Sequence, residues 1–198
     1  MLVRCLQQMY TDELHYCDYY NHCRKIPCRD PQTNLQKNHD FRLRFVCPES
    51  QLCIIQYRHP VEAISSWFEL VLREPSWLER LTVRDNQKGW ERFFAEKVTY
   101  WKRFVEKWVL GSQASNRMLL PYHLLVQDPE SQLRRIADFV GQGKPLPEFK
   151  FEWTLKIQDI ESKKRVADFR YCNREWMEEA ERGVADVLEA ANIPEIEV

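Results

Sequence analysis

Glycine is scarce in this sequence and unevenly placed. The chain of 198 residues has five glycines, and none of them precedes Gly89. A glycine-rich phosphate loop needs residues without a side chain, because the backbone must turn tightly and approach the phosphate oxygens closely. The part of the chain before Gly89 therefore contains no such loop.

The sequence also lacks a charge imbalance and a long hydrophobic run. Lysine and arginine number 29 against 30 aspartates and glutamates, which gives a formal net charge of −1. A nearly neutral chain has no global attraction for nucleic acid or a membrane surface, so any anion site must be local. No apolar run approaches the roughly 20 residues that span a bilayer. Residues 1–10 are amphipathic and do not resemble a secretory signal.

Seven cysteines are scattered along the chain, at positions 5, 17, 23, 28, 47, 53 and 172. An odd, scattered set favours reduced thiols in a cytoplasmic protein over a disulfide framework. Cys17, His22, Cys23 and Cys28 are of residue types that bind zinc, but they contain no C-x₂-C pair and match no common zinc module. We therefore expect buried or surface thiols and no metal.

Apolar residues are plentiful, and segments with the apolar pattern of a strand alternate with segments that have the apolar period of a helix. Hydrophobic residues make up 44% of the chain and aromatic residues 13%, which predicts a single globular domain over residues 1–198. Short apolar runs predict strands within 14–20, 35–41, 52–57 and 118–122. Helical spacing predicts helices at 2–10, 61–72, about 90–108, 128–141 and from about 173. This alternation predicts an α/β fold with a largely parallel sheet flanked by helices.

The long helix predicted after Gly89 carries a row of large apolar side chains. Such a row is far more often core packing than a cofactor site, so we assign it no chemistry. Its members are Trp90, Phe94, Val98, Trp101, Val105 and Trp108.

The segment 54–67 carries the strongest functional signal. Arg58 directly follows an apolar strand, Pro60 opens a helix, and Ser66 stands eight residues after the arginine. A guanidinium offers a planar fork of donors, and a helix start adds unpaired backbone N–H groups. This arrangement predicts a site for a phosphate group. Ser65 is adjacent and is an alternative to Ser66 as the residue that faces the ligand.

Segment 54–67 and three further segments together resemble the sulfotransferase family. Members of this family use 3′-phosphoadenosine 5′-phosphosulfate. Segment 118–129 is similar to the family's strand that ends in a tyrosine near the adenine, here Tyr122. A helix with the family pattern follows it, as Pro129-Glu130 through Gly141. Lys37-Asn38-His39 is similar to the family's Lys-x-His, whose histidine is the general base.

The fourth similar segment is a basic run. Residues 163–169, which begin Lys163-Lys164-Arg165, resemble a family loop that closes over the nucleotide, although Lys164 and Ala167 replace its glycines. The family's loop for the 5′-phosphosulfate is absent here, and in the family it directly precedes a helix like residues 2–10. We therefore expect a P-loop-NTPase-like sulfotransferase fold that is truncated at its N-terminus.

The resemblance implies roles for particular residues. Arg58 and Ser66 would bind the ribose 3′-phosphate, with Tyr122, Lys163 and Lys164 as further nucleotide ligands. His39 would act as base, with Lys37 near the transferring group. Each role has a simpler structural alternative: a solvated lysine, a loop histidine, a surface ion pair or a core tyrosine. Asp40 or another carboxylate is a candidate to orient His39.

Three functions fit these features. The first is a sulfotransferase that moves a sulfuryl group to a hydroxyl or amine of a small molecule, carbohydrate or peptide, with no metal and no nucleic-acid partner. The second is a non-catalytic remnant of that fold, serving as a binding or interaction module. The third, another nucleotide-using α/β transferase such as a kinase relative, ranks last because no Walker-type loop supports it.

Overall fold

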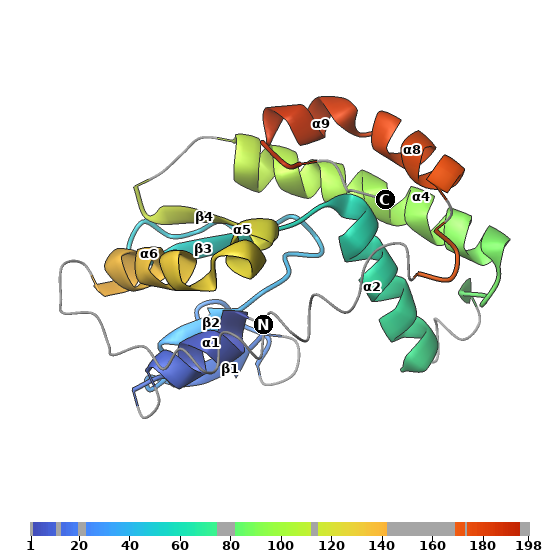
Figure 1. Ribbon diagram of the computed structural model, residues 1–198. Coiled ribbons are helices and arrows are strands. Elements are labelled where there is room, and N and C mark those ends of the chain that lie inside the picture. Colours follow the sequence, from blue (N-terminus) through green and yellow to red (C-terminus); the bar gives the residue numbers. More distant parts are fainter. Residues whose placement is uncertain are drawn as a thin grey trace.

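The computed structural model describes residues 2–10, 13–19, 23–74, 82–111, 115–141, 169–172 and 174–194. Within these ranges helices alternate with short strands in an α/β arrangement, as the sequence predicts (Figure 1). The strands form two separate parallel pairs, β1 with β2 and β3 with β4, where the sequence predicted one sheet.

The longer pair consists of β3 (Cys53–Tyr57) and β4 (Arg117–Pro121). The strands pair along their whole length, so their last residues, Tyr57 and Pro121, are partners. Parallel neighbours need a long crossover, and here it contains two helices, α2 (Pro60–Arg73) and α4 (Gln87–Val105). The carboxyl ends of β3 and β4 therefore lie at one edge of the pair.

Helices cover both faces of this pair, as is usual for parallel strands. On one face, Met118 and Leu120 pack in a cluster with Cys5 and Leu6, together with residues of α5 and α6. The three helices on this face are α1 (Leu2–Met9), α5 (Tyr122–Gln127) and α6 (Pro129–Gly141). Figure 1 shows α6 lying along β3 and β4.

The opposite face packs against the long helix. Tyr57 contacts the cluster around Trp101 and Val105 of α4. Ile55 packs with Trp108, which lies in η1 (Glu106–Leu110), a π-helical turn that continues α4. The side chains that the sequence assigned to the core are buried or packed against it, which confirms that prediction. They are Trp90, Phe94, Val98, Trp101, Val105 and Trp108.

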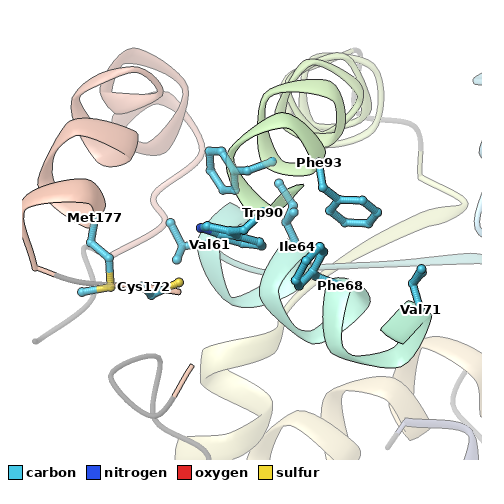
Figure 2. Packing of buried hydrophobic residues seen from close by; sticks show 9 residues of the cluster. Val61, Ile64, Phe68, Val71, Trp90, Phe93, Cys172 and Met177 are labelled. Carbon is cyan, nitrogen blue, oxygen red and sulfur yellow. The ribbon is translucent and has the colours of Figure 1, made fainter. Parts of the chain in front are cut away.

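A third packing region joins α2 to α4. The apolar face of α2 places Ile64 and Phe68 against Trp90 and Phe93 of α4 (Figure 2). The ring centroids of Phe68 and Trp90 are 5.3 Å apart in an edge-on arrangement. Met177, on α8 (Arg174–Arg182), closes the far side of this cluster. The direction of α2 away from β3 is therefore fixed by aromatic packing.

The shorter pair is only three residues long on each strand. β1 (Tyr16–Asp18) pairs with β2 (Leu35–Lys37), which places Asp18 opposite Lys37. Leu35 is partly buried against the cluster that contains α1, and Figure 1 shows α1 beside this pair. This region therefore joins the rest of the fold through α1.

Several element boundaries differ from the sequence predictions. The strands predicted within 14–20 and 35–41 cover only Tyr16–Asp18 and Leu35–Lys37. The last predicted helix is two helices, because α8 ends at Arg182 and α9 (Ala185–Ala190) begins after a turn at Gly183 and Val184. Tyr122 does not end a strand: β4 stops at Pro121, and Tyr122 begins α5. Proline cannot donate to the strand ladder, so pairing ends there.

The prediction of reduced thiols is wrong for two of the seven cysteines. Cys47 and Cys53 form a disulfide across a short loop, with their Cα atoms 6.5 Å apart. Asn116 Nδ2 holds the loop between them by donating to the carbonyl oxygens of Pro48, at 2.8 Å, and Gln51, at 2.9 Å. Cys47 and Cys53 are six positions apart, and the turn between them brings their sulfurs within bonding range. The other five cysteines are free.

No helix in the described ranges has the length and apolar character needed to cross a bilayer.

Candidate functional site

Arg58 and Tyr122 meet at the carboxyl edge of the β3–β4 pair. Each directly follows its strand, and because Tyr57 pairs with Pro121, the next residues are neighbours. The guanidinium carbon of Arg58 lies 5.0 Å from the centroid of the Tyr122 ring, over its face. Cation–π contacts of this kind hold an arginine in a fixed direction. The structure thus brings together two residues that are 64 positions apart in the sequence.

Two hydrogen bonds further fix Arg58. Its Nη2 group donates to the carbonyl oxygen of Glu62, in the first turn of α2. Its own carbonyl oxygen accepts from Nε1 of Trp101 on α4, at 3.0 Å. A guanidinium has five N–H donors, so the bond to Glu62 leaves further donors of the fork for an anion. The side chain is therefore held beside the start of α2, where the positive end of the helix dipole favours negative charge.

Ser65 and Ser66 point in different directions. Ser66 is exposed, and it lies one turn beyond Glu62 on the same face of α2, the face that Arg58 contacts. Ser65 is 2% exposed, and its Oγ atom is 3.5 Å from Sγ of Cys172. Of the two serines, only Ser66 shares a helix face with the arginine.

His59 is a structural residue that the sequence analysis did not single out. Its Nδ1 accepts from the backbone N–H of Val61 at 3.3 Å and so caps α2, with Pro60 at the first helical position. Burial lowers the pKa of His59 to about 4. Its Nε2 lies 3.3 Å from Glu181 Oε1 on α8, but without hydrogen-bond geometry. The sequence signal that could have identified this cap is a polar residue directly before a proline that opens a helix.

His39 lies in the loop after β2 and is held by α4. Its carbonyl oxygen accepts from the hydroxyl of Tyr100 at 2.7 Å, and its ring stacks on Phe41 with centroids 5.1 Å apart. Its side chain is exposed at the surface, yet desolvation by the surrounding protein lowers the pKa of the imidazole below its ordinary value of 6.5. The Lys37 charge lowers this pKa further, while Asp18 opposes the shift. The imidazole is therefore neutral at pH 7, the form that can accept a proton.

The His39 and Arg58 segments meet the same turn of α4. Tyr100 holds the carbonyl of His39, and the next residue, Trp101, holds the carbonyl of Arg58. Phe41 also reaches α2, with its ring centroid 5.4 Å from that of Trp67, which follows Ser66. The loop that carries His39 and the start of α2 are thus both tied to one part of the long helix.

Lys37 is engaged in an ion pair. Its Nζ lies 3.7 Å from Oδ2 of Asp18, its partner across the β1–β2 pair, and the lysine side chain is 40% exposed. Asp18 also accepts from the hydroxyl of Tyr16 at 3.2 Å, and burial beside this carboxylate raises the pKa of Tyr16 to about 12. To act on a transferring group, the ammonium would have to leave Asp18.

Asp40 anchors the His39 loop through its carboxylate. One oxygen accepts from Nζ of Lys107 at 2.6 Å and from Nε1 of Trp108 at 3.0 Å, both in η1. The other accepts from the backbone N–H groups of Arg44 and Phe45, each at 2.9 Å. These contacts position the loop rather than the imidazole itself, so Asp40 acts on His39 only through the backbone.

Two of the predicted nucleotide ligands, Lys163 and Lys164, lie outside the described residues. A cavity of about 350 Å³ lies between α2, α4 and residues 169–172. Ser65, the predicted alternative to Ser66, lines it together with Asp85 and Trp90, whereas the other described residues predicted for the site do not. The hydroxyl of Tyr171 donates to Asp85 at 2.5 Å at this cavity.

Three cysteines that the sequence assigned to separate thiols form a cluster. The Sγ atoms of Cys17, Cys23 and Cys28 all lie within 4.8 Å of one another, and those of Cys17 and Cys23 are 3.0 Å apart. Neighbouring donors, Thr33 first, lower the pKa of Cys28 to about 7, whereas the bond to Cys23 and burial raise that of Cys17 to about 12. The spacing of the three cysteines along the sequence did not predict that their sulfur atoms would lie together.

Comparison with known proteins adds no further information on the site. No protein-family model, no curated protein and no solved structure matches the chain. The functional argument therefore depends on the contacts described above.

Proposed function

We propose that this chain binds the adenosine 3′-phosphate portion of 3′-phosphoadenosine 5′-phosphosulfate and transfers its sulfuryl group to an acceptor hydroxyl or amine. The observation that carries the proposal is the Arg58–Tyr122 pair at the carboxyl edge of β3 and β4. Ligands of open parallel sheets bind at this edge, and the positive end of the α2 helix dipole lies there.

Arg58 supplies the charge that a phosphate needs. Its remaining guanidinium donors can form a two-pronged contact with phosphate oxygens, which a lysine cannot reproduce. Ser66, exposed on the same face of α2, offers a hydroxyl one turn beyond the carbonyl that Arg58 contacts. Tyr122 presents its ring to the guanidinium and orients it.

His39 would act as the base. In sulfuryl transfer, the acceptor loses its proton to a neutral ring nitrogen of His39 as its oxygen or nitrogen bonds to sulfur. The bond from sulfur to the 5′-phosphate oxygen breaks, and adenosine 3′,5′-bisphosphate leaves. A positioned base contributes about 10²- to 10⁴-fold to such a step. The lowered pKa of His39 keeps the imidazole in the accepting form at neutral pH.

A non-catalytic binding module is the second candidate, and one observation favours it. Lys37 is paired with Asp18 and so is not free to act on a transferring group. Such a protein would bind the bisphosphate through Arg58 and would not turn over. The two candidates therefore share the nucleotide site and differ in chemistry.

Nucleotide binding tests what both candidates share. Calorimetry with adenosine 3′,5′-bisphosphate should show binding to the wild-type chain, and Arg58→Ala should weaken it by about 1.5–3 kcal/mol, the range for hydrogen bonds to charged groups. Arg58→Lys should recover only part of this loss. The control is Arg134→Ala, because Arg134 is exposed and pairs with Glu130 on α6. Equal affinity of Arg58→Ala and wild type would remove the phosphate assignment.

Turnover separates the two candidates. With 3′-phosphoadenosine 5′-phosphosulfate and a panel of sugar, phenol and peptide acceptors, the wild type should release the bisphosphate, and His39→Ala should lose turnover while retaining nucleotide affinity. Because the pKa of His39 is lowered, activity should persist at pH 6.5 and fall only at lower pH, as the imidazole becomes protonated. Nucleotide binding without turnover on any acceptor would favour the binding module.

A further inference from the structure

The thiol cluster of Cys17, Cys23 and Cys28 gathers three sulfur atoms around one point. Cys17 lies on β1, while Cys23 and Cys28 lie in the segment that leads to β2. All three are free, and their Sγ atoms lie within 4.8 Å of one another. The separation of 3.0 Å between the sulfurs of Cys17 and Cys23 is well beyond a disulfide bond of about 2.05 Å.

This geometry is that of a thiolate metal site. Zinc binds cysteine sulfur at about 2.3 Å, which places the sulfurs of a tetrahedral site roughly 3.8 Å apart. The separation of Cys17 and Cys23, 3.0 Å, is below this value, and no separation in the cluster exceeds 4.8 Å. We propose that Cys17, Cys23 and Cys28 bind one zinc ion, which joins β1 to the segment before β2.

Neighbouring polar groups already hold the sulfurs in place. Gln36, on β2, donates from Nε2 to the sulfur of Cys23 at 3.1 Å, and its Oε1 accepts from the backbone N–H of Cys28 at 3.1 Å. Thr33 donates from Oγ1 to the sulfur of Cys28 at 3.5 Å. Donors of this kind orient metal ligands and favour their charged form.

The surrounding charge also suits a thiolate site. Three thiolates and one Zn²⁺ carry a net charge of −1, and each thiol releases its proton as its sulfur coordinates the ion. Three exposed cations, Arg24, Lys25 and Arg29, stand beside Cys23 and Cys28 in the chain and offset this charge. Cys17 is buried and the other two are half-buried, so solvent can reach the ion and water can fill the fourth position.

The proposed ion would have a structural role. β1 and β2 are three residues long and gain little from apolar burial, whereas a metal link between them does not depend on the size of a core. β2 ends at Lys37, two residues before His39, so the ion would fix the start of that loop. This inference does not depend on nucleotide binding or turnover.

Metal content tests the site directly. The full chain, purified without chelator and saturated with Zn²⁺, should retain about one zinc per chain by elemental mass spectrometry after free metal is removed. Cys23→Ser and Cys28→Ser should each reduce the retained zinc at least tenfold. Cys172→Ser should retain it, because that free thiol lies in the α2–α4 cluster. Co²⁺ in place of Zn²⁺ should give a thiolate charge-transfer band. Zinc retention equal to wild type in both variants would overturn the proposal.

Thiol alkylation of the wild-type chain tests the site without any variant, so misfolding cannot obscure the result. Added Zn²⁺ should slow labelling of Cys17, Cys23 and Cys28 at least tenfold, as read by peptide mass spectrometry, and leave Cys5 and Cys172 unchanged. Equal labelling rates with and without Zn²⁺ would overturn the inference. A native disulfide between Cys17 and Cys23, seen as a loss of two hydrogen masses on that peptide pair, would also overturn it.

Discussion

The two strand pairs share parallel topology but differ in what holds them together. β3 and β4 pair over five residues each, and helices bury both faces. β1 and β2 pair over three residues each, and the side chains of β2 are all half-buried. Apolar burial stabilises the first pair, while an ion pair, side-chain hydrogen bonds and a thiol cluster surround the second.

This difference in stabilisation explains how the two halves of the candidate site are positioned. Arg58 and Tyr122 stand at the end of the well-packed pair, so their geometry is set by a hydrophobic core. Lys37 is the last residue of the weakly packed pair and is held by Asp18. His39 follows the pair, and its loop depends on polar anchors, Asp40 and Tyr100. The nucleotide half of the proposed site should therefore be more robust to mutation than the half that carries the base.

The largest expected effect comes from the core of the β3–β4 pair. Leu120 is fully buried among residues of α1, α5 and α6. Leu120→Ala should lower the free energy of unfolding by about 2–5 kcal/mol, because it removes apolar contacts and leaves a cavity. Leu35→Ala, in β2, should cost only about 1 kcal/mol, because its side chain is partly buried. Urea unfolding measures both; equal losses would contradict the distinction between the two pairs.

A smaller effect is expected at the anchor of the His39 loop. Asp40→Asn keeps the shape of the side chain but removes the charge that faces Lys107. We expect a loss of about 1.5–3 kcal/mol in the free energy of unfolding, since hydrogen bonds to a charged group are lost.

Asp30→Asn is the matched control for this change. Asp30 also accepts a backbone N–H, from Gln32 at 3.0 Å, but it is exposed, so the change should cost no more than about 0.5 kcal/mol. Thermal unfolding of the two variants compares them. If the two losses were equal, the Asp40 contacts would not anchor the loop.

The effect that is smallest at neutral pH concerns the cap of α2, because it appears only in acid. The pKa of His59 is about 4 in the folded chain against 6.5 for an ordinary histidine, so between these values the unfolded chain binds the extra proton. Stability should therefore be complete above pH 6.5 and fall as the pH drops towards 4, by up to about 3 kcal/mol.

His59→Asn isolates this contribution. Asparagine is a good N-cap and does not titrate, so the variant should keep the helix and lose part of the pH dependence. Urea unfolding at pH 7 and pH 5 measures the difference. An unchanged pH dependence in the variant would show that His59 is not the group responsible.

The sequence predicted the elements around the candidate site well, because each is encoded by a short local pattern. Residues 52–57 read as an apolar strand, and Pro60 with the apolar spacing after it marked α2. The roles given to Arg58, Ser66, Tyr122, Lys37 and His39 stay predictions. The contact between Arg58 and Tyr122 depends on the register of two strands, which no local pattern specifies. The same is true of the bonds from Tyr100 and Trp101 to the two site segments.

The cysteines show the limit of local patterns most clearly. Spacing argued for separate reduced thiols, yet folding joins Cys47 to Cys53 and gathers three others within 4.8 Å. The positions of the helices and strands and their apolar faces can be predicted from the sequence, because they follow from periodicity over a few turns or residues. The meetings of strand ends, thiols and loops cannot, because these contacts join distant residues through the packing of the whole chain.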